Sequence, residues 1–419
     1  MFSRITDMGS SAERFTEHIS ICSDMKLAMH KCSACFKQYK RKEHLVLHMK
    51  DSYHSVHEPK CGVCQKHCKT FESLREHLTG PLSKENCSRI YADHCCSLCM
   101  KFFDNPASLT EHKEMCQLPA PAPLGTFAKP CMEYEIDSSD SDNGYYTRSP
   151  RAVALDCEMV GGESDGSLDL CARVCLIDED ENLIFHTYVR PETPVTDYRC
   201  KITGITEHHL RDAMPLEEVN ERLEQILYNG ESIGRLRWDG GKARLLVGHD
   251  VHHDLHCLKI NYPDRLVRDT AKYRPFMKTN LVSHSLKYLT QTYLGYEIQA
   301  GVHDPFVDCV SVMRLYKRMR AQNHPVEELG TVTQNSLPTS LDSWDFEKLE
   351  SMTPDQLFQI SKSDYRCWCS DSRPELLEDE ELHSGRDEWA PDSNQKSQAW
   401  PAWPHAPELK SLLTNVAWS

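Results

Sequence analysis

The 419-residue sequence contains no long apolar run. No stretch approaches the ~20 consecutive apolar residues of a transmembrane helix, so a membrane-spanning protein is not expected. The first residues, MFSRITDMGSSAERF, lack the apolar segment of a secretory signal. Without secretion, disulfide pairing of the 20 cysteines is not expected, and metal binding becomes the better use of so many thiols.

Apolar residues are modest in number, and charge and cysteine are unevenly distributed. Hydrophobic residues make up 39% of the chain, so we expect part of it to lie outside any core. Eleven of the 20 cysteines precede residue 117, where 17 basic residues face 14 acidic ones. The last 94 residues carry 7 basic and 18 acidic residues. The overall charge of −15 therefore comes mostly from the tail and says little about the working domains.

These shifts in composition predict five segments. An N-terminal segment, 1–29, precedes a Cys/His/Lys-rich region, 30–116. Residues 117–149 combine Pro and Ala with an acidic Ser/Asp run and read as a flexible linker, so the parts on either side should fold separately. Residues 150–325 carry regular patterns. An acidic and largely disordered tail, 326–419, with one helix near 353–363, completes the prediction.

The patterned segment predicts an α/β fold. Strands are expected at 152–160, 172–178, 183–189, 244–250 and 267–269, with a turn at 180–182. Helices are expected at 216–228, from about 251 to 260, near 283–294, and from 305 to 320. Early strands followed by alternating strands and helices indicate a mixed sheet with flanking helices.

Two units of the cysteine-rich region repeat the spacing of small ββα zinc fingers. They are Cys32-x2-Cys35-x12-His48-x5-His54 and Cys96-x2-Cys99-x12-His112-x3-Cys116. A hairpin presents two ligands and a helix the other two, which closes a tetrahedron around Zn²⁺. Tyr39 and Leu45 occupy the small core of the first unit, and Phe103 and Leu109 repeat their spacing in the third. His57 competes with His54 as the last ligand of the first unit.

A middle unit, Cys61-x2-Cys64-x12-His77, has no fourth ligand within five residues. Cys87 is the next candidate and requires an enlarged loop through Gly80 and Pro81. The alternative is a finger remnant without zinc. Irregular spacing between the three units argues against tandem reading of DNA bases, so RNA or protein docking is at least as well supported.

Paired carboxylates mark the first predicted strand. In LDCEMVG, Asp156 and Glu158 lie two residues apart, and a period of two points both side chains to the same face. Like charges on an apolar strand are costly unless a cation joins them. The alternative is an exposed edge strand, which the flanking AVAL and MV disfavour.

Two further motifs add acids and a histidine. In GHDVHHDL, Asp250 is a natural N-cap and Asp254 lies one turn inside the following helix. In HDPFVD, Pro305 suits the first helical position, which puts His303 just before the helix and Asp308 in its first turn. Four acids and one histidine in this order fit a two-metal nuclease, in which carboxylates clamp two divalent ions such as Mg²⁺.

These three motifs resemble those of the DnaQ-like, RNase T-type exonuclease superfamily with histidine in the third motif (DEDDh). The form LDCEMVG, with ITGIT at 202–206 and RDTAKYRPF at 268–276, is similar to the RNA exonuclease branch, which includes the interferon-stimulated exonuclease and the apoptosis-enhancing nuclease. The resemblance covers roughly residues 150–322, and the N-terminal fingers resemble plant-type members. It implies a ribonuclease H-like fold for an exonuclease domain at 150–325.

The resemblance also implies an activity. This is stepwise 3′→5′ hydrolysis of single-stranded RNA, and in some members of single-stranded DNA, to 5′-mononucleotides with two Mg²⁺ or Mn²⁺. Asp156, Glu158, Asp254 and Asp308 would be the metal ligands and His303 the general base. Met159, beside the paired acids, is either a contact of the terminal nucleotide or plain core. The family and the basic run KQYKRK at 37–42 favour the nucleus over the cytoplasm.

Two other functions fit parts of the sequence. In an adaptor, the fingers would bind nucleic acid or protein and the nuclease fold would be inactive, although all five motif residues are present. In a repair exonuclease, the substrate would be DNA. Contacts to a 2′-hydroxyl would separate RNA from DNA, and no sequence pattern reveals them.

Overall fold

A computed structural model describes residues 29–125, 152–231, 242–324, 341–361 and 365–372. The acidic run of the predicted linker and the tail beyond residue 372 lie outside the described residues. Within the described ranges, no helix has the length and apolar character needed to cross a bilayer.

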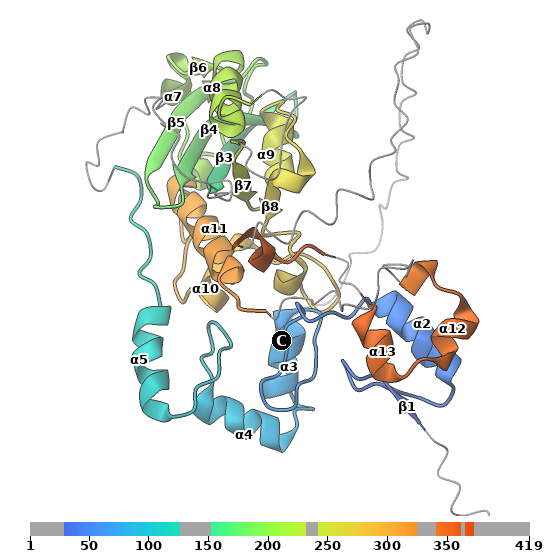
Figure 1. Cartoon of the computed structure of the whole chain (residues 1–419). Coiled ribbons are helices and arrows are strands. Elements are labelled where there is room, and N and C mark those ends of the chain that lie inside the picture. Colours follow the sequence, from blue (N-terminus) through green and yellow to red (C-terminus); the bar gives the residue numbers. More distant parts are fainter. Residues whose placement is uncertain (1–28, 126–151, 232–241, 325–340, 362–364, 373–419) are drawn as a thin grey trace, which may run out of the picture. The chain divides into compact units, whose positions relative to one another are not determined.

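A mixed sheet forms the centre of the patterned domain (Figure 1). Its strands are β3 (Ala152–Gly162), β4 (Leu168–Asp178), β5 (Leu183–Arg190), β6 (Met214–Pro215), β7 (Leu245–Gly248) and β8 (Val267–Asp269), in the order β6-β5-β4-β3-β7-β8. β3, β4 and β5 are antiparallel neighbours, whereas β7 runs parallel to β3, β8 to β7 and β6 to β5. The predicted α/β class with a mixed sheet is confirmed.

Helices flank this sheet. They are α6 (Cys200–Thr203), α7 (Glu207–Arg211), α8 (Leu216–Tyr228), α9 (Val251–Cys257), α10 (Leu286–Tyr293) and α11 (Pro305–Arg320), with 3-10 turns η2 (Asp264–Leu266) and η3 (Arg274–Phe276). α11 contacts β3, β4 and β7, and α9 contacts β3 and β4. The bounds of α8, β8 and α11 agree with the sequence. For the two helices the reason is a strong local signal, an amphipathic stripe in α8 and a proline at the first position of α11.

The cysteine-rich region forms three small units. Its elements are β1 (His30–Lys31), β2 (Gln38–Tyr39), α2 (Lys42–Ser52), α3 (Phe71–Thr79), α4 (Glu85–His94) and α5 (Pro106–Cys116). Each unit has the same turn after its first cysteine: Phe36, Gln65 and Met100 have φ values of 65°, 62° and 63°. Their amides donate to the carbonyl oxygens of the three leading cysteines, at 3.1, 2.9 and 2.9 Å. The repeat predicted from spacing is therefore also a repeat of backbone geometry.

The middle unit packs on the patterned domain. This differs from the prediction that the parts on either side of the linker at 117–149 fold separately. Phe71, Leu74 and Leu78 belong to the same buried cluster as the sheet and α11. The Arg75 guanidinium donates to the Thr292 carbonyl at 3.4 Å. Composition marks where a linker lies, but it cannot show that an apolar face of the middle unit matches one beside α10.

Residues 341–361 and 365–372, which the sequence assigns to the tail, contain regular structure. η4 (Leu341–Ser343), α12 (Phe346–Ser351) and α13 (Pro354–Gln359) form the first piece, and η5 (Trp368–Ser372) lies in the second. Leu349 and Leu357 join Leu45 and Met49 of α2 in a small separate core. Figure 1 shows α12 and α13 beside α2. The disordered tail was therefore placed too early, because the apolar partner of this segment lies some 300 positions away in the chain.

A buried ion pair attaches η5 to the sheet. Arg268 on β8 donates from Nε and Nη2 to the two carboxylate oxygens of Asp371, at 2.8 and 2.7 Å. Tyr316 donates to the same carboxylate at 3.1 Å. Both charged side chains are almost completely buried, so each depends on the other for compensation.

We predict that Asp371→Ala destabilises the protein by about 3–5 kcal/mol, because it removes the carboxylate that pairs with the buried Arg268 charge. Chemical denaturation monitored by circular dichroism measures the change. The control is Glu192→Ala, which removes an exposed pair with Lys259 and should cost no more than about 1 kcal/mol. Equal effects of the two substitutions would contradict the structural role assigned to Asp371.

Candidate nuclease and metal sites

The paired acids of β3 begin the candidate active site. Asp156 lies opposite Cys175 of β4 and Glu158 opposite Arg173, and a β-bulge follows Glu158. Glu158 is buried and Asp156 is partly exposed. β3 is an inner strand of the sheet, because it pairs with β4 along most of its length and with β7 at residues 152–154. The two carboxylates follow directly after the pairing with β7 ends, so the strand places them just beyond the end of β7.

The start of α11 brings the third motif to the same place. Ligand atoms of Glu158, His303 and Asp308 all lie within 4.8 Å of one another. Asp304 caps the helix by accepting from the Phe306 amide at 3.0 Å, which fixes Asp308 one turn inside it. The His303 amide donates to the Ile202 carbonyl at 2.7 Å, so the loop before the helix is also held.

Asp254 completes the group of acids. It is buried in the first turn of α9, which packs on β3 and β4. Burial raises the pKa of Asp254 well above its ordinary value, and the carboxylates of Asp250, Asp269 and Glu158 raise it further. Asp254 lies outside the 4.8 Å group, but its charge acts on the same carboxylates.

The charges of these acids strongly oppose one another. Burial, followed by the carboxylates of Asp308, Asp254 and Glu158, raises the pKa of Asp156 well above its ordinary value. Burial and Asp308 raise the pKa of Glu158 to about 8, and burial raises that of Asp308 to about 7. Four acids that are difficult to ionise together at neutral pH indicate that a cation belongs among them.

The hydrogen bonds of Asp308 support the same conclusion. Gln299 donates from Nε2 to Asp308 Oδ2 at 2.8 Å. The other oxygen, Oδ1, is buried and has no hydrogen-bond partner. A buried carboxylate oxygen without a donor is costly, and a hard divalent cation such as Mg²⁺ or Mn²⁺ would compensate it. The donor set therefore fits the predicted metals.

Asp250 differs from its prediction. It precedes α9 but adopts a left-handed conformation, with φ 57°, and its side chain caps nothing. Its backbone amide donates instead to Asp269 Oδ1 at 2.8 Å. Asp250 therefore occupies the expected N-cap position, but the expected side-chain cap is wrong, because a side chain on a left-handed residue does not point at the first helical amides. Asp269 and Gln299, which support this site, had no recognised sequence signal of their own.

Met159 is partly buried and packs against the main core. This position is compatible with both readings of the residue, so its contact with a terminal nucleotide stays a prediction.

The three finger units assemble the ligand sets that the spacing predicts. Cys and His side chains gather as Cys32, Cys35, His48 and His54; Cys61, Cys64, His77 and Cys87; and Cys96, Cys99, His112 and Cys116. In the middle unit, the loop through Gly80 and Pro81 leads into α4, which supplies Cys87. His57, the competing ligand of the first unit, lies elsewhere.

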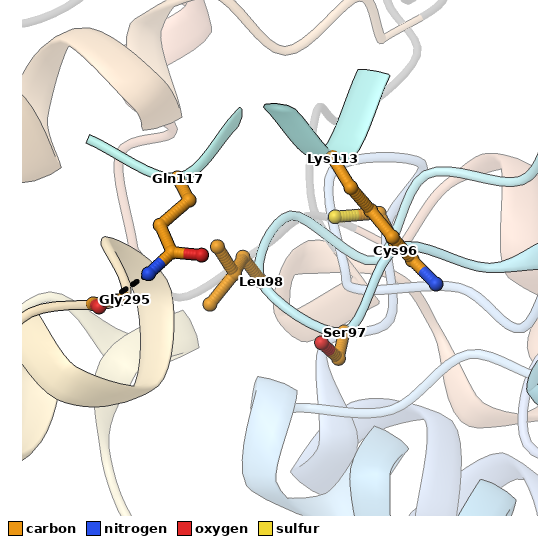
Figure 2. Close-up of a pocket in the computed structure, with 6 residues that line it drawn as sticks. All are labelled: Cys96, Ser97, Leu98, Lys113, Gln117 and Gly295. Atoms are coloured by element: carbon orange, nitrogen blue, oxygen red, sulfur yellow. Dashed lines mark hydrogen bonds between the residues drawn. The ribbon is translucent and has the colours of Figure 1, made fainter. Parts of the chain in front are cut away.

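A pocket beside the third unit shares the candidate zinc ligand Cys96 with that unit and is separate from the carboxylate site. Cys96, Ser97, Leu98, Lys113, Gln117 and Gly295 line it, and Gln117 donates to the Gly295 carbonyl at 3.3 Å (Figure 2). None of the five predicted catalytic residues lines this pocket.

Comparison with known proteins finds a family match in the patterned domain. Residues 153–316 match the RNase T exonuclease family. The match spans all three motifs and agrees with their resemblance to exonucleases of the DEDDh kind.

Named relatives agree with this class. RNA exonuclease 4 of Kluyveromyces lactis is 36% identical over 167 residues, which are 39% of this chain and 52% of that protein. The Homo sapiens protein of the same name is 36% identical over 174 residues, 41% of this chain and 38% of its own. The chain thus spans about half or less of these relatives. Among solved structures, the Neurospora crassa Pan2 catalytic unit is similar with a TM-score of 0.36 and 18% identity, covering 52% of this chain and 33% of that one.

The two aspartates of GHDVHHD allow a direct test of the assignment. We predict that Asp254→Asn lowers nuclease turnover by at least about 10²-fold, because an amide cannot supply the lost charge. Asp250→Asn should keep most activity, because this side chain is largely exposed and Asn tolerates the left-handed conformation. Single-turnover assays measure both variants. A dead Asp250→Asn beside an active Asp254→Asn would reverse the assignment.

Proposed function

We propose that this chain is a metal-dependent 3′–5′ exoribonuclease that shortens single-stranded RNA to 5′-mononucleotides, with single-stranded DNA as a second substrate. The observation that carries the proposal is the convergence of Asp156, Glu158, Asp254 and Asp308 with His303 inside an RNase T-type domain. The relatives named RNA exonuclease 4 support RNA as the substrate.

The four carboxylates would hold two Mg²⁺ or Mn²⁺ ions. Such a pair, when bound, supplies positive charge to the attacking and the leaving oxygen of a phosphodiester. The charges of all three other acids raise the pKa of Asp156, so Asp156 would be one of the residues that hold the ions. Gln299 orients Asp308 by holding Oδ2, and leaves Oδ1 for a cation.

His303 would accept the proton of the attacking water. It is half-buried beside Glu158 and Asp308, and its backbone is held by Ile202. Burial and the positive charge of Lys287 lower the pKa of His303. The imidazole is therefore neutral at neutral pH, which is the form that a general base needs.

The finger units would each hold a structural Zn²⁺. Ligand atoms in all three lie at separations that suit one ion: Cys35 Sγ to His48 Nε2 is 3.2 Å, Cys64 Sγ to His77 Nε2 is 3.3 Å and Cys99 Sγ to His112 Nε2 is 3.2 Å. Thiolate and imidazole ligands favour zinc over the hard cations of the carboxylate site.

We also propose that the protein resides in the nucleus, because of the family resemblance and the basic run at 37–42. Imaging of a tagged chain in cells tests this proposal.

Metal dependence tests the activity. We predict that EDTA abolishes the shortening of end-labelled single-stranded RNA and that Mg²⁺ or Mn²⁺ restores it, because the buried carboxylates need divalent charge. The assay runs RNA and DNA of equal sequence side by side and identifies the products by chromatography. A ladder that is unchanged in EDTA would contradict the two-metal site. RNA binding without hydrolysis would favour the alternative, an adaptor with an inactive nuclease fold.

The role of His303 predicts a pH dependence. Because its folded pKa lies below the ordinary value of about 6.5, the rate should rise with pH on the acid side of 6.5 and level off above it. His303→Ala should lower turnover by ~10²–10⁴-fold and remove this limb. The measurement is a pH–rate profile of both proteins, with Mn²⁺ binding as the control. Loss of Mn²⁺ binding in the variant would make His303 a ligand rather than a base.

A further inference from the structure

Four side chains outside the finger and carboxylate sites converge on one point. His57, His324, Cys367 and Cys369 offer nitrogen and sulfur atoms that all lie within 4.8 Å of one another. His57 follows the first finger, His324 follows α11, and the two cysteines flank Trp368 at the start of η5. Sequence spacing offered His57 only as a competing ligand of the first finger.

Four distances between the ligand atoms of these side chains describe the cluster. The two imidazole Nδ1 atoms are 3.2 Å apart. Cys369 Sγ lies 3.3 Å from His324 Nδ1 and 3.4 Å from His57 Nδ1, and Cys367 Sγ lies 3.4 Å from His324 Nδ1. Two thiols and two imidazoles thus converge on a single point, as the ligands of a zinc ion do.

A tetrahedral zinc ion explains these separations. With Zn–N of about 2.0 Å and Zn–S of about 2.3 Å, neighbouring ligand atoms lie roughly 3.3–3.8 Å apart. The contacts agree with this range as well as those of the predicted finger sites do, where Cys35 Sγ lies 3.2 Å from His48 Nε2.

We propose that His57, His324, Cys367 and Cys369 form a fourth zinc site. Two nitrogen and two sulfur ligands fill the four positions of Zn²⁺ and leave none open for water or substrate. The site is therefore structural, and it is independent of the proposed nuclease chemistry.

Burial, a hydrogen bond and an aromatic stack fix the side chains around the site. Cys367 and Cys369 are buried, and the Tyr365 hydroxyl donates to the His57 carbonyl at 2.6 Å. Trp368, between the cysteines, stacks on Tyr273 with ring centroids 3.8 Å apart. These contacts hold the cysteines and His57 in place on the side of the exonuclease domain.

The ion would join three distant segments of the chain. His57 is 267 residues from His324 and 312 from Cys369. The segment that carries the cysteines also follows α12 and α13, which pack on the first finger. Zinc at this point would therefore tie the first finger and the C-terminal segment to the end of α11, and its loss should loosen both.

The test counts zinc ions on the folded full-length chain by native mass spectrometry. Cys367→Ser combined with Cys369→Ser should bind one zinc fewer than wild type. The control, Cys200→Ser, changes an exposed cysteine outside every cluster and should bind the wild-type number. Equal zinc counts in wild type and the double variant would overturn the proposal.

A second measurement covers the case in which the double variant does not fold. Wild type is alkylated while a chelator removes its zinc in steps, and peptide mass spectrometry records which cysteines react. Cys367 and Cys369 should react together, in a step that releases one zinc. Alkylation of both with every zinc retained, or a disulfide between them in the native chain, would overturn the proposal.

Discussion

Mutual repulsion among buried carboxylates is the constraint around which the exonuclease domain is arranged. β3 carries Asp156 and Glu158 just beyond the end of its pairing with β7, and α9 and α11 each add one aspartate. Burial makes each charge costly, and proximity raises that cost. Divalent cations would compensate this repulsion, and Asp308 Oδ1, which is buried and has no hydrogen-bond partner, marks one place for such a charge.

Short-range patterns in the sequence predict most of this site. A period of two sends Asp156 and Glu158 to one face, and Asp304 with Pro305 fixes where α11 begins, hence where Asp308 lies. The same rules fail at Asp250, because its left-handed backbone depends on the Asp269 carboxylate, 19 residues away. Gln299 likewise supports Asp308 from a loop without any recognisable pattern.

Local sequence patterns do not predict contacts between distant segments of the chain. Finger spacing predicts the three ligand sets, because each lies within some 30 consecutive residues. The set around His57 spans 312 residues, so no local spacing reveals it. For the same reason, composition predicts a largely disordered tail from residue 326, with one helix near 353–363 that corresponds to α13. It does not predict that Leu349 and Leu357 pack on α2 or that Asp371 pairs with Arg268.

Two kinds of metal chemistry are thus separated in one chain. Sulfur and nitrogen ligands suit zinc and structural roles, whereas the carboxylate oxygens suit Mg²⁺ or Mn²⁺ and a reaction. This separation matters for the EDTA experiment, because EDTA also binds zinc; the zinc content of the chain is therefore measured before Mg²⁺ or Mn²⁺ is added back.

Direct titration of the zinc-loaded protein with Mn²⁺, followed by electron paramagnetic resonance in the presence of a 5′-mononucleotide, tests the central claim. The account predicts two bound Mn²⁺ ions per chain in wild type and weakened binding in Asp156→Asn, with the zinc content unchanged. The absence of Mn²⁺ binding in wild type, or equal binding in Asp156→Asn, would contradict it.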